Sequence, residues 1–124
     1  MLHRRKPYST GTWSAGKFKP FNKIAFKRAN DIGQFSDVDF KEFLKNENNK
    51  IQTLAIGDSY TEGLQVNNSS TYHGILNKKL TNNKKNIIST AIAASGMALP
   101  NYIASIIYTK ELIDLDKIIL IISI

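Results

Sequence analysis

The sequence predicts an α/β protein whose parallel sheet is built in the order β-α-β-α-β. Three runs rich in aliphatic residues, at 51–56, 86–94 and 118–124, are typical of strands, and the two segments between them repeat apolar residues at helical spacing. Strands that alternate with helices favour a parallel sheet, because neighbouring parallel strands need a long crossover connection. These crossovers are expected to be right-handed.

The first strand is expected to end in a tight turn with a serine at its tip. The aliphatic run stops abruptly at Gly57-Asp58-Ser59, a turn composition. Chemistry in open α/β sheets collects outside the carboxyl ends of the strands, so Ser59 is expected at the functional edge. Gly57 and Gly63 bracket the turn and permit backbone conformations that a Cβ would disfavour. Asp58 is expected to support the turn by accepting hydrogen bonds from backbone N–H groups.

Residues 57–63, Gly-Asp-Ser-Tyr-Thr-Glu-Gly, resemble the first signature block of the GDSL/SGNH hydrolase superfamily, which commonly reads Gly-Asp-Ser-x-Thr-x-Gly. The resemblance implies a three-layer, flavodoxin-like parallel sheet. It also implies that Ser59 is the nucleophile of an esterase or lipase, that the Ser59 N–H helps to line an oxyanion hole, and that the chemistry needs no cofactor. The Gly-x-Ser-x-Gly elbow of α/β-hydrolases is absent from the sequence.

The second strand ends in Ala94-Ser95-Gly96-Met97, which resembles the second block of the same family. There a glycine N–H is an oxyanion donor, and the resemblance gives this role to Gly96. A backbone donor approaches a developing oxyanion closely where no side chain intervenes. The alternative is a plain loop glycine, but its place one βαβ unit after Ser59 favours the functional interpretation. Ser95 is given no role.

Two helices are predicted between the strands. The first follows a capping Ser or Thr within 69–71, and its apolar face comprises Tyr72, Ile75, Leu76 and Leu80. The second has Pro100 in its first turn, and its apolar stripe comprises Ile103, Ile106, Ile107 and Ile113. A shorter helix is predicted around Phe40, Phe43 and Leu44. The run at 118–124 is typical of a strand buried on both faces.

His73 lies in the first turn of the helix after Ser59. It is either the general base for Ser59 or a surface or packing histidine. In the family, the catalytic histidine comes from a much later loop, usually three residues after an aspartate. Since nothing of that kind surrounds His73, the packing interpretation is favoured.

Residues 1–50 are predicted to form a basic, aromatic-rich N-terminal extension, and residues 51–124 the hydrolase-like part. Residues 1–30 contain 8 of the 17 Lys and Arg residues and none of the 10 Asp and Glu residues. Glycines and prolines, at Pro7, Gly11, Gly16 and Pro20, are expected to interrupt any regular element there. Farther along, Asn30 and Gly33 resemble an Asn-x-x-Gly stretch that precedes the Gly-Asp-Ser strand in larger relatives.

This basic segment has two interpretations. It either grips phosphates and stacks on bases, or lays its aromatic rings over the domain and leaves its charges in water. The absence of an RNA-binding signature favours the second, so nucleic acid is not the expected partner. A non-catalytic module that binds nucleic acid or an anionic surface is the alternative to an enzyme.

Composition excludes several other classes. The chain has no cysteine, hence no disulfide framework and no thiolate metal site, and no metal cluster is evident. No apolar run approaches the roughly 20 residues of a membrane helix. The basic N-terminus is not followed by an apolar region typical of a secretory signal. A soluble chain is expected, and no compartment is assigned.

The expected function is a serine hydrolase that cleaves carboxylic esters or O-acetyl groups of small molecules or saccharides through an acyl-enzyme at Ser59. The third family block, a Gly-x-Asn-Asp-like turn, and the later Asp-x-x-His are absent from the sequence. The chain is therefore expected to be a truncated portion of the fold and inactive alone. Its third strand is expected to be an exposed apolar edge that favours self-association.

Overall fold

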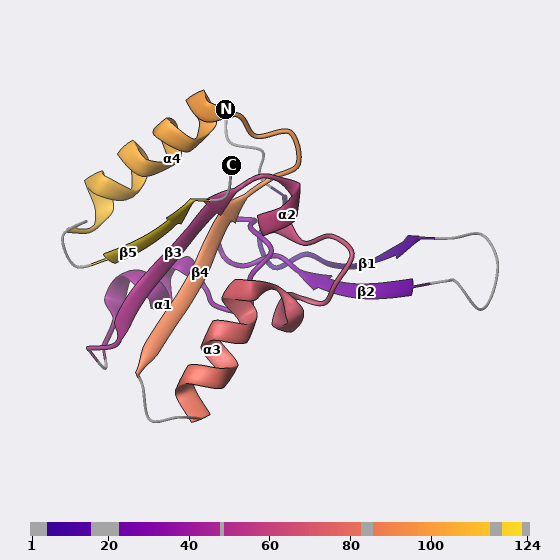
Figure 1. Ribbon diagram of the computed structural model, residues 1–124, viewed down its shortest axis with the longest axis horizontal. Coiled ribbons are helices and arrows are strands. Elements are labelled where there is room, and N and C mark those ends of the chain that lie inside the picture. Colours follow the sequence, from indigo (N-terminus) through magenta and orange to yellow (C-terminus); the bar gives the residue numbers. More distant parts are fainter. Residues whose placement is uncertain (1–4, 16–22, 48, 83–85, 115–117, 123–124) are drawn as a thin grey trace.

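The computed structural model describes residues 5–15, 23–47, 49–82, 86–114 and 118–122 (Figure 1). Its elements in chain order are the strands and helices β1 (Thr10–Ala15), β2 (Lys23–Arg28), α1 (Phe40–Lys45), β3 (Ile51–Gly57), α2 (Ser59–Glu62), the 3-10 turn η1 (Asn68–Ser70), α3 (Tyr72–Asn82), β4 (Ile87–Ala93), α4 (Leu99–Leu112) and β5 (Ile118–Ile122). The predicted α/β class is thereby confirmed.

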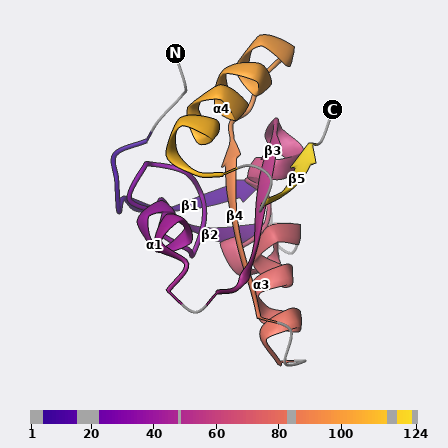
Figure 2. The ribbon, with the colours of Figure 1, turned by 90° about the vertical axis from the view of Figure 1, so that its left-hand side faces the viewer.

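The strands β3, β4 and β5 form a parallel sheet in the order β4-β3-β5. The first strand of the β-α-β-α-β unit therefore lies in the middle. The register pairs Gly57 with Ala93 and Ile56 with Ile122, so all three strands end at the same edge. Figure 2 shows α1 and α4 on one side of this sheet and α3 on the other.

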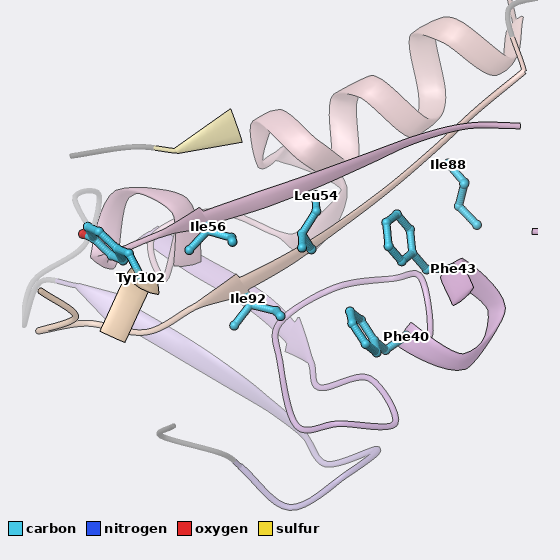
Figure 3. Close-up of a cluster of buried hydrophobic side chains, with 7 residues drawn as sticks. All are labelled: Phe40, Phe43, Leu54, Ile56, Ile88, Ile92 and Tyr102. Atoms are coloured by element: carbon cyan, nitrogen blue, oxygen red, sulfur yellow. The ribbon is translucent and has the colours of Figure 1, made fainter. Parts of the chain in front are cut away.

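The hydrophobic core lies between the sheet and the helices α1 and α4 (Figure 3). Leu54, Ile56 and Ile92 of the strands share this cluster with Tyr102 of α4 and with Phe40 and Phe43 of α1, whose rings stack with 5.8 Å between their centroids. The short helix predicted around these phenylalanines is present and contributes to the same core as the strands.

Residues 10–15 and 23–28 form an antiparallel hairpin, so the expectation that glycine and proline prevent regular structure in this segment was wrong. Pro7 precedes β1, and Gly16 and Pro20 lie between the strands, outside the described residues. Gly11 is accommodated within β1, where a Cβ would meet no atom within 4 Å. On β2, Phe26 is 66% exposed and does not cover the domain.

Helix α3 begins as predicted, since Thr71 Oγ1 accepts a hydrogen bond from Gly74 N–H over 3.2 Å. Its buried face differs from the prediction: His73 and Gly74 are buried, whereas Ile75 is exposed. Gly74 permits this orientation because a Cβ there would collide with the Asn68 carbonyl oxygen. The helix thus packs through His73 and Gly74 and not through Ile75, while Leu76 is half-buried; the side chain of Leu80 lies outside the described residues.

Helix α3 also closes the outer edge of β4. Asn77 Nδ2 donates to Ser89 O over 2.8 Å, and Ser89 N–H donates to Asn77 Oδ1 over 2.7 Å. Asn77 does not leave its side-chain amide to solvent. Its amide instead supplies the donor and acceptor that a further strand would supply.

Helix α4 is present with Pro100 in its first turn, but its predicted apolar stripe was also wrong in part. Tyr102, Ser105 and Thr109 are buried, whereas Ile103 and Ile107 are exposed. The two hydroxyls tolerate burial because each donates to the carbonyl oxygen four residues earlier over 2.8 Å.

Strand β5 is confirmed at residues 118–122, but it is not buried on both faces as predicted. Ile119 is 54% exposed and Ile122 is also exposed. The reason is its place at the edge of the described sheet. Among the described strands it pairs with β3 alone, and α3 packs on β4, the strand on the other side of β3.

Replacing Phe43 by alanine tests whether α1 belongs to the core. Because its side chain is fully buried, Phe43→Ala should lower the free energy of unfolding by about 3–5 kcal/mol. The exposed Phe26 gives the matched control, and Phe26→Ala should change stability by less than about 0.5 kcal/mol. Urea titrations followed by circular dichroism measure both, and equal losses would contradict the core assignment.

Candidate functional site

Ser59 lies where the sequence predicted, in the turn that follows β3 at the carboxyl edge of the sheet. Its side chain is exposed. Asp58 precedes the short helix α2, and Tyr60 N–H donates to Asp58 Oδ1 over 3.0 Å. Gly63 ends α2 with φ +57°, and its N–H donates to Ser59 O over 2.9 Å. A larger residue is disfavoured at Gly63 by this φ and by Thr71, whose methyl carbon would lie 2.8 Å from an added Cβ.

Gly96 lies in a second turn at the same edge. Since Gly57 pairs with Ala93, the turns after β3 and β4 leave the sheet at the same level. Met97 N–H donates to Ala94 O over 3.1 Å, and Gly96 has φ +83°, the arrangement of a type II turn. An added Cβ would meet no atom within 4 Å, so the glycine is favoured by its backbone conformation and not by a lack of space.

Two backbone donors at this edge are uncommitted. The N–H groups of Ser59 and Gly96 donate to no acceptor within the part of the chain that the structure describes. Neighbouring turns thus present a hydroxyl and two amide donors to solvent. Such a set can attack a carbonyl carbon and stabilise negative charge on the carbonyl oxygen.

Glu62 connects the two turns, and sequence reasoning missed it. Its side chain is fully buried, and Oε2 accepts from Ser95 N–H over 2.9 Å and from Ser95 Oγ over 2.6 Å. Its other oxygen, Oε1, forms an ion pair with Arg5. The available signal was its position three residues after Ser59, on the same helical turn, but its partners lie 33 and 57 residues away.

The N-terminal segment supplies a second cation beside this site, Lys27, which is buried. Lys27 Nζ donates to Gly63 O over 2.8 Å and to Glu62 O over 3.3 Å. Burial lowers the pKa of Lys27 to about 8; the Glu62 carboxylate opposes this change, and the Arg5 charge adds to it. The Arg5 guanidinium also lies 3.9 Å from the centre of the Phe35 ring. The expectation that this segment leaves its charges in water is therefore wrong for Arg5 and Lys27.

The Asn30–Gln34 loop contacts the end of β4, directly before the second turn. Asn30 Oδ1 accepts from Gln34 N–H over 2.9 Å, and Gln34 Oε1 accepts from Ala93 N–H over 2.8 Å. Gly33 has φ +77°, and a Cβ there would collide with the Arg5 carbonyl oxygen. The Asn-x-x-Gly stretch therefore links the N-terminal segment to the end of β4.

His73 is buried, and neither of its ring nitrogens has a partner at hydrogen-bond distance and angle within the described ranges; the Thr61 backbone lies near the ring without meeting this geometry. It therefore makes no hydrogen bond to Ser59, the contact that a general base needs. Burial and then the Lys27 charge lower the pKa of His73 to about 4, although the Thr61 backbone and Asp37 act in the opposite direction. The imidazole packs edge-on against Tyr72, with 5.7 Å between ring centres. These contacts fit the packing interpretation.

The described residues hold neither a metal-binding cluster nor a membrane-spanning helix. They contain no group of three or more His, Asp or Glu residues that could hold a metal ion. None of their helices is long and apolar enough to cross a membrane.

The chain matches no protein-family model, no curated protein and no solved structure. Its function is therefore inferred from the arrangement of its own residues.

The lowered pKa of His73 predicts a pH-dependent stability. Between pH 6.5 and about 4 the unfolded chain binds a proton that the folded chain does not, so stability is greatest above this window and falls as pH falls. The free energy of unfolding should decrease by about 2 kcal/mol from pH 7 to pH 5 on account of His73.

The variant His73→Leu isolates this contribution. It should remove that decrease and, because it deletes two buried nitrogens without partners, should not lower stability at pH 7. Urea titrations of both proteins at pH 5, 6 and 7 measure the effect. The same pH slope in both would show that His73 does not titrate in this window.

Proposed function

We propose that the chain carries the nucleophile and two oxyanion donors of a serine ester hydrolase of the GDSL/SGNH type. The observation that supports this most is the shared sheet edge, where the exposed hydroxyl of Ser59 lies in one turn and Gly96 lies in the next. The N–H of each residue donates to no acceptor within the described residues. The Gly-Asp-Ser-x-Thr-x-Gly pattern adds the chemistry expected of a serine in this position.

The strand order supports the finer fold assignment within this proposal. In flavodoxin-like sheets the first strand lies between the second and the third. The order β4-β3-β5 has the same arrangement, with the Ser59 strand in the middle. Ligands of such sheets bind outside the carboxyl ends, next to the point where the strand order reverses, and Ser59 follows the central strand at this edge.

The reaction begins when Ser59 Oγ attacks the carbonyl carbon of an ester and passes its proton to a general base. The tetrahedral oxyanion accepts hydrogen bonds from the N–H groups of Ser59 and Gly96. The C–O bond to the alcohol then breaks, the base returns the proton to the leaving oxygen, and water hydrolyses the acyl-serine. Losing one such donor typically lowers the rate about 10²–10³-fold.

The substrates proposed are carboxylic esters and O-acetyl groups, on small molecules or saccharides. Asp58 is not expected to act on the substrate, because its carboxylate accepts the Tyr60 N–H. Since His73 makes no bond to Ser59, no histidine of the described residues is in place to act as the base.

Replacing Ser59 tests the proposal directly. In the natural protein at its full length, Ser59→Ala should abolish hydrolysis of an activated acetate ester and labelling by a fluorophosphonate probe, because no acyl-enzyme can form. Ser70→Ala, at another exposed serine, is the matched control and should leave both unchanged. Unchanged hydrolysis in Ser59→Ala would remove Ser59 from the mechanism.

The 124-residue chain alone is expected to hydrolyse the same ester at a rate close to that of its Ser59→Ala variant. A serine hydroxyl needs an adjacent base, and the imidazole of His73 is buried without a bond to Ser59. Spectrophotometric assays of both proteins against buffer measure the difference. Turnover that disappears in Ser59→Ala would contradict this expectation, and variants of His3 and His73 would then identify the base.

A further inference from the structure

The buried carboxylate of Glu62 lies between the turn of Ser59 and the turn of Gly96. We propose that Glu62 is a positioning residue that fixes the direction of the Gly96 N–H relative to Ser59; this inference rests on the ester-hydrolase function proposed above. Glu62 belongs to the helical turn that begins with Ser59, and its Oε2 binds the residue directly before Gly96.

Apart from Glu62, the second turn is held by one internal hydrogen bond and by the Tyr102 hydroxyl, which donates to Met97 O over 3.3 Å. Ser95 and Gly96 are both exposed, and a Cβ on Gly96 would meet open space. The turn contains one internal hydrogen bond, from Met97 N–H to Ala94 O. The two bonds from Ser95 to one carboxylate oxygen add an anchor, and hydrogen bonds to a charged acceptor are the shorter and stronger kind. Because Ser95 directly precedes Gly96, fixing its N–H and hydroxyl fixes the Cα at one end of the peptide plane that carries the Gly96 N–H.

The carboxylate is itself held from the other side. Oε1 pairs with Arg5, whose guanidinium stacks on Phe35. The Glu62 N–H donates to Asp58 O over 2.9 Å, and the Glu62 carbonyl oxygen accepts from Lys27. The Glu62 side chain is therefore constrained at both carboxylate oxygens, and its backbone is constrained at its N–H and at its carbonyl oxygen. These constraints suit a residue that positions a neighbouring turn.

Glu62 is not proposed as the base for Ser59. Its two carboxylate oxygens accept from Ser95 and Arg5, and it makes no hydrogen bond to the Ser59 side chain in the described part of the chain. Its effect on the reaction is indirect, through the Ser95–Gly96 peptide.

The test uses the natural protein at full length, assayed with an activated acetate ester. Glu62→Leu removes both bonds to Ser95 and should lower kcat about 10–100-fold, as a misplaced catalytic group does, with KM changed less than twofold. Glu62→Gln keeps an oxygen that can accept from Ser95 and should recover most of the lost kcat. Glu47→Gln removes the carboxylate of an exposed ion pair and should change neither constant.

A second measurement separates positioning from general stability. Hydrogen exchange at the Ser95 amide, followed by NMR, should be at least tenfold faster in Glu62→Leu, while amides in the core of β3 exchange as in the wild type. If Glu62→Leu does not fold, Ser95→Ala replaces it: this exposed residue loses the 2.6 Å bond only, and kcat should fall about tenfold with KM unchanged.

The outcomes distinguish this inference from the proposed function. If Ser59→Ala is inactive while a folded Glu62→Leu, or Ser95→Ala in its place, keeps kcat within twofold of the wild type, the positioning role is overturned and the hydrolase function stands. If Ser59→Ala keeps full activity, the hydrolase function and the positioning role are both overturned. If every amide in β3 exchanges faster in Glu62→Leu, the residue is structural and the positioning role is overturned.

Discussion

A carboxylate buried beneath the Ser59 turn determines how distant parts of this chain meet. Burying an ionised group is costly unless it is paired and hydrogen-bonded. Glu62 meets this requirement with Arg5 from the N-terminal segment and with Ser95 from the loop after β4. Lys27 adds a cation that binds the backbone around Glu62. Glu62 is thus one of the points at which the basic segment at the start of the chain joins residues 51–124.

Local pattern was enough to predict the elements of the parallel sheet but not their buried faces. Runs of aliphatic residues gave β3, β4 and β5, and helical spacing gave α3 and α4. The inward faces differed because Gly74, Ser105 and Thr109 pack closely or bond their own backbone, whereas periodicity assigns aliphatic residues to the interior. The hairpin β1–β2 was missed since its pairing joins strands whose sequences are interrupted by turn-forming residues.

The candidate site likewise contains some residues that the sequence predicted and others that it did not. Ser59 and Gly96 were located from short motifs at strand ends, because the register of a parallel sheet brings successive strand ends to one edge. The roles of Arg5, Lys27 and Glu62 depend on contacts with residues 33 to 57 positions away, and no spacing rule encodes such contacts. The burial of the Glu62 carboxylate could be recognised only from the folded structure, in which its partners surround it.

The amide side chains along β4 have a consequence for how the sheet can grow. Asn77 occupies the outward-facing peptide groups of Ser89, and Gln34 occupies the N–H of Ala93, so an incoming strand would have to displace both amides. On the opposite side, β5 pairs only with β3 in the described sheet. Strand addition is therefore hindered at the β4 flank, whereas β5 is an edge strand in the described sheet.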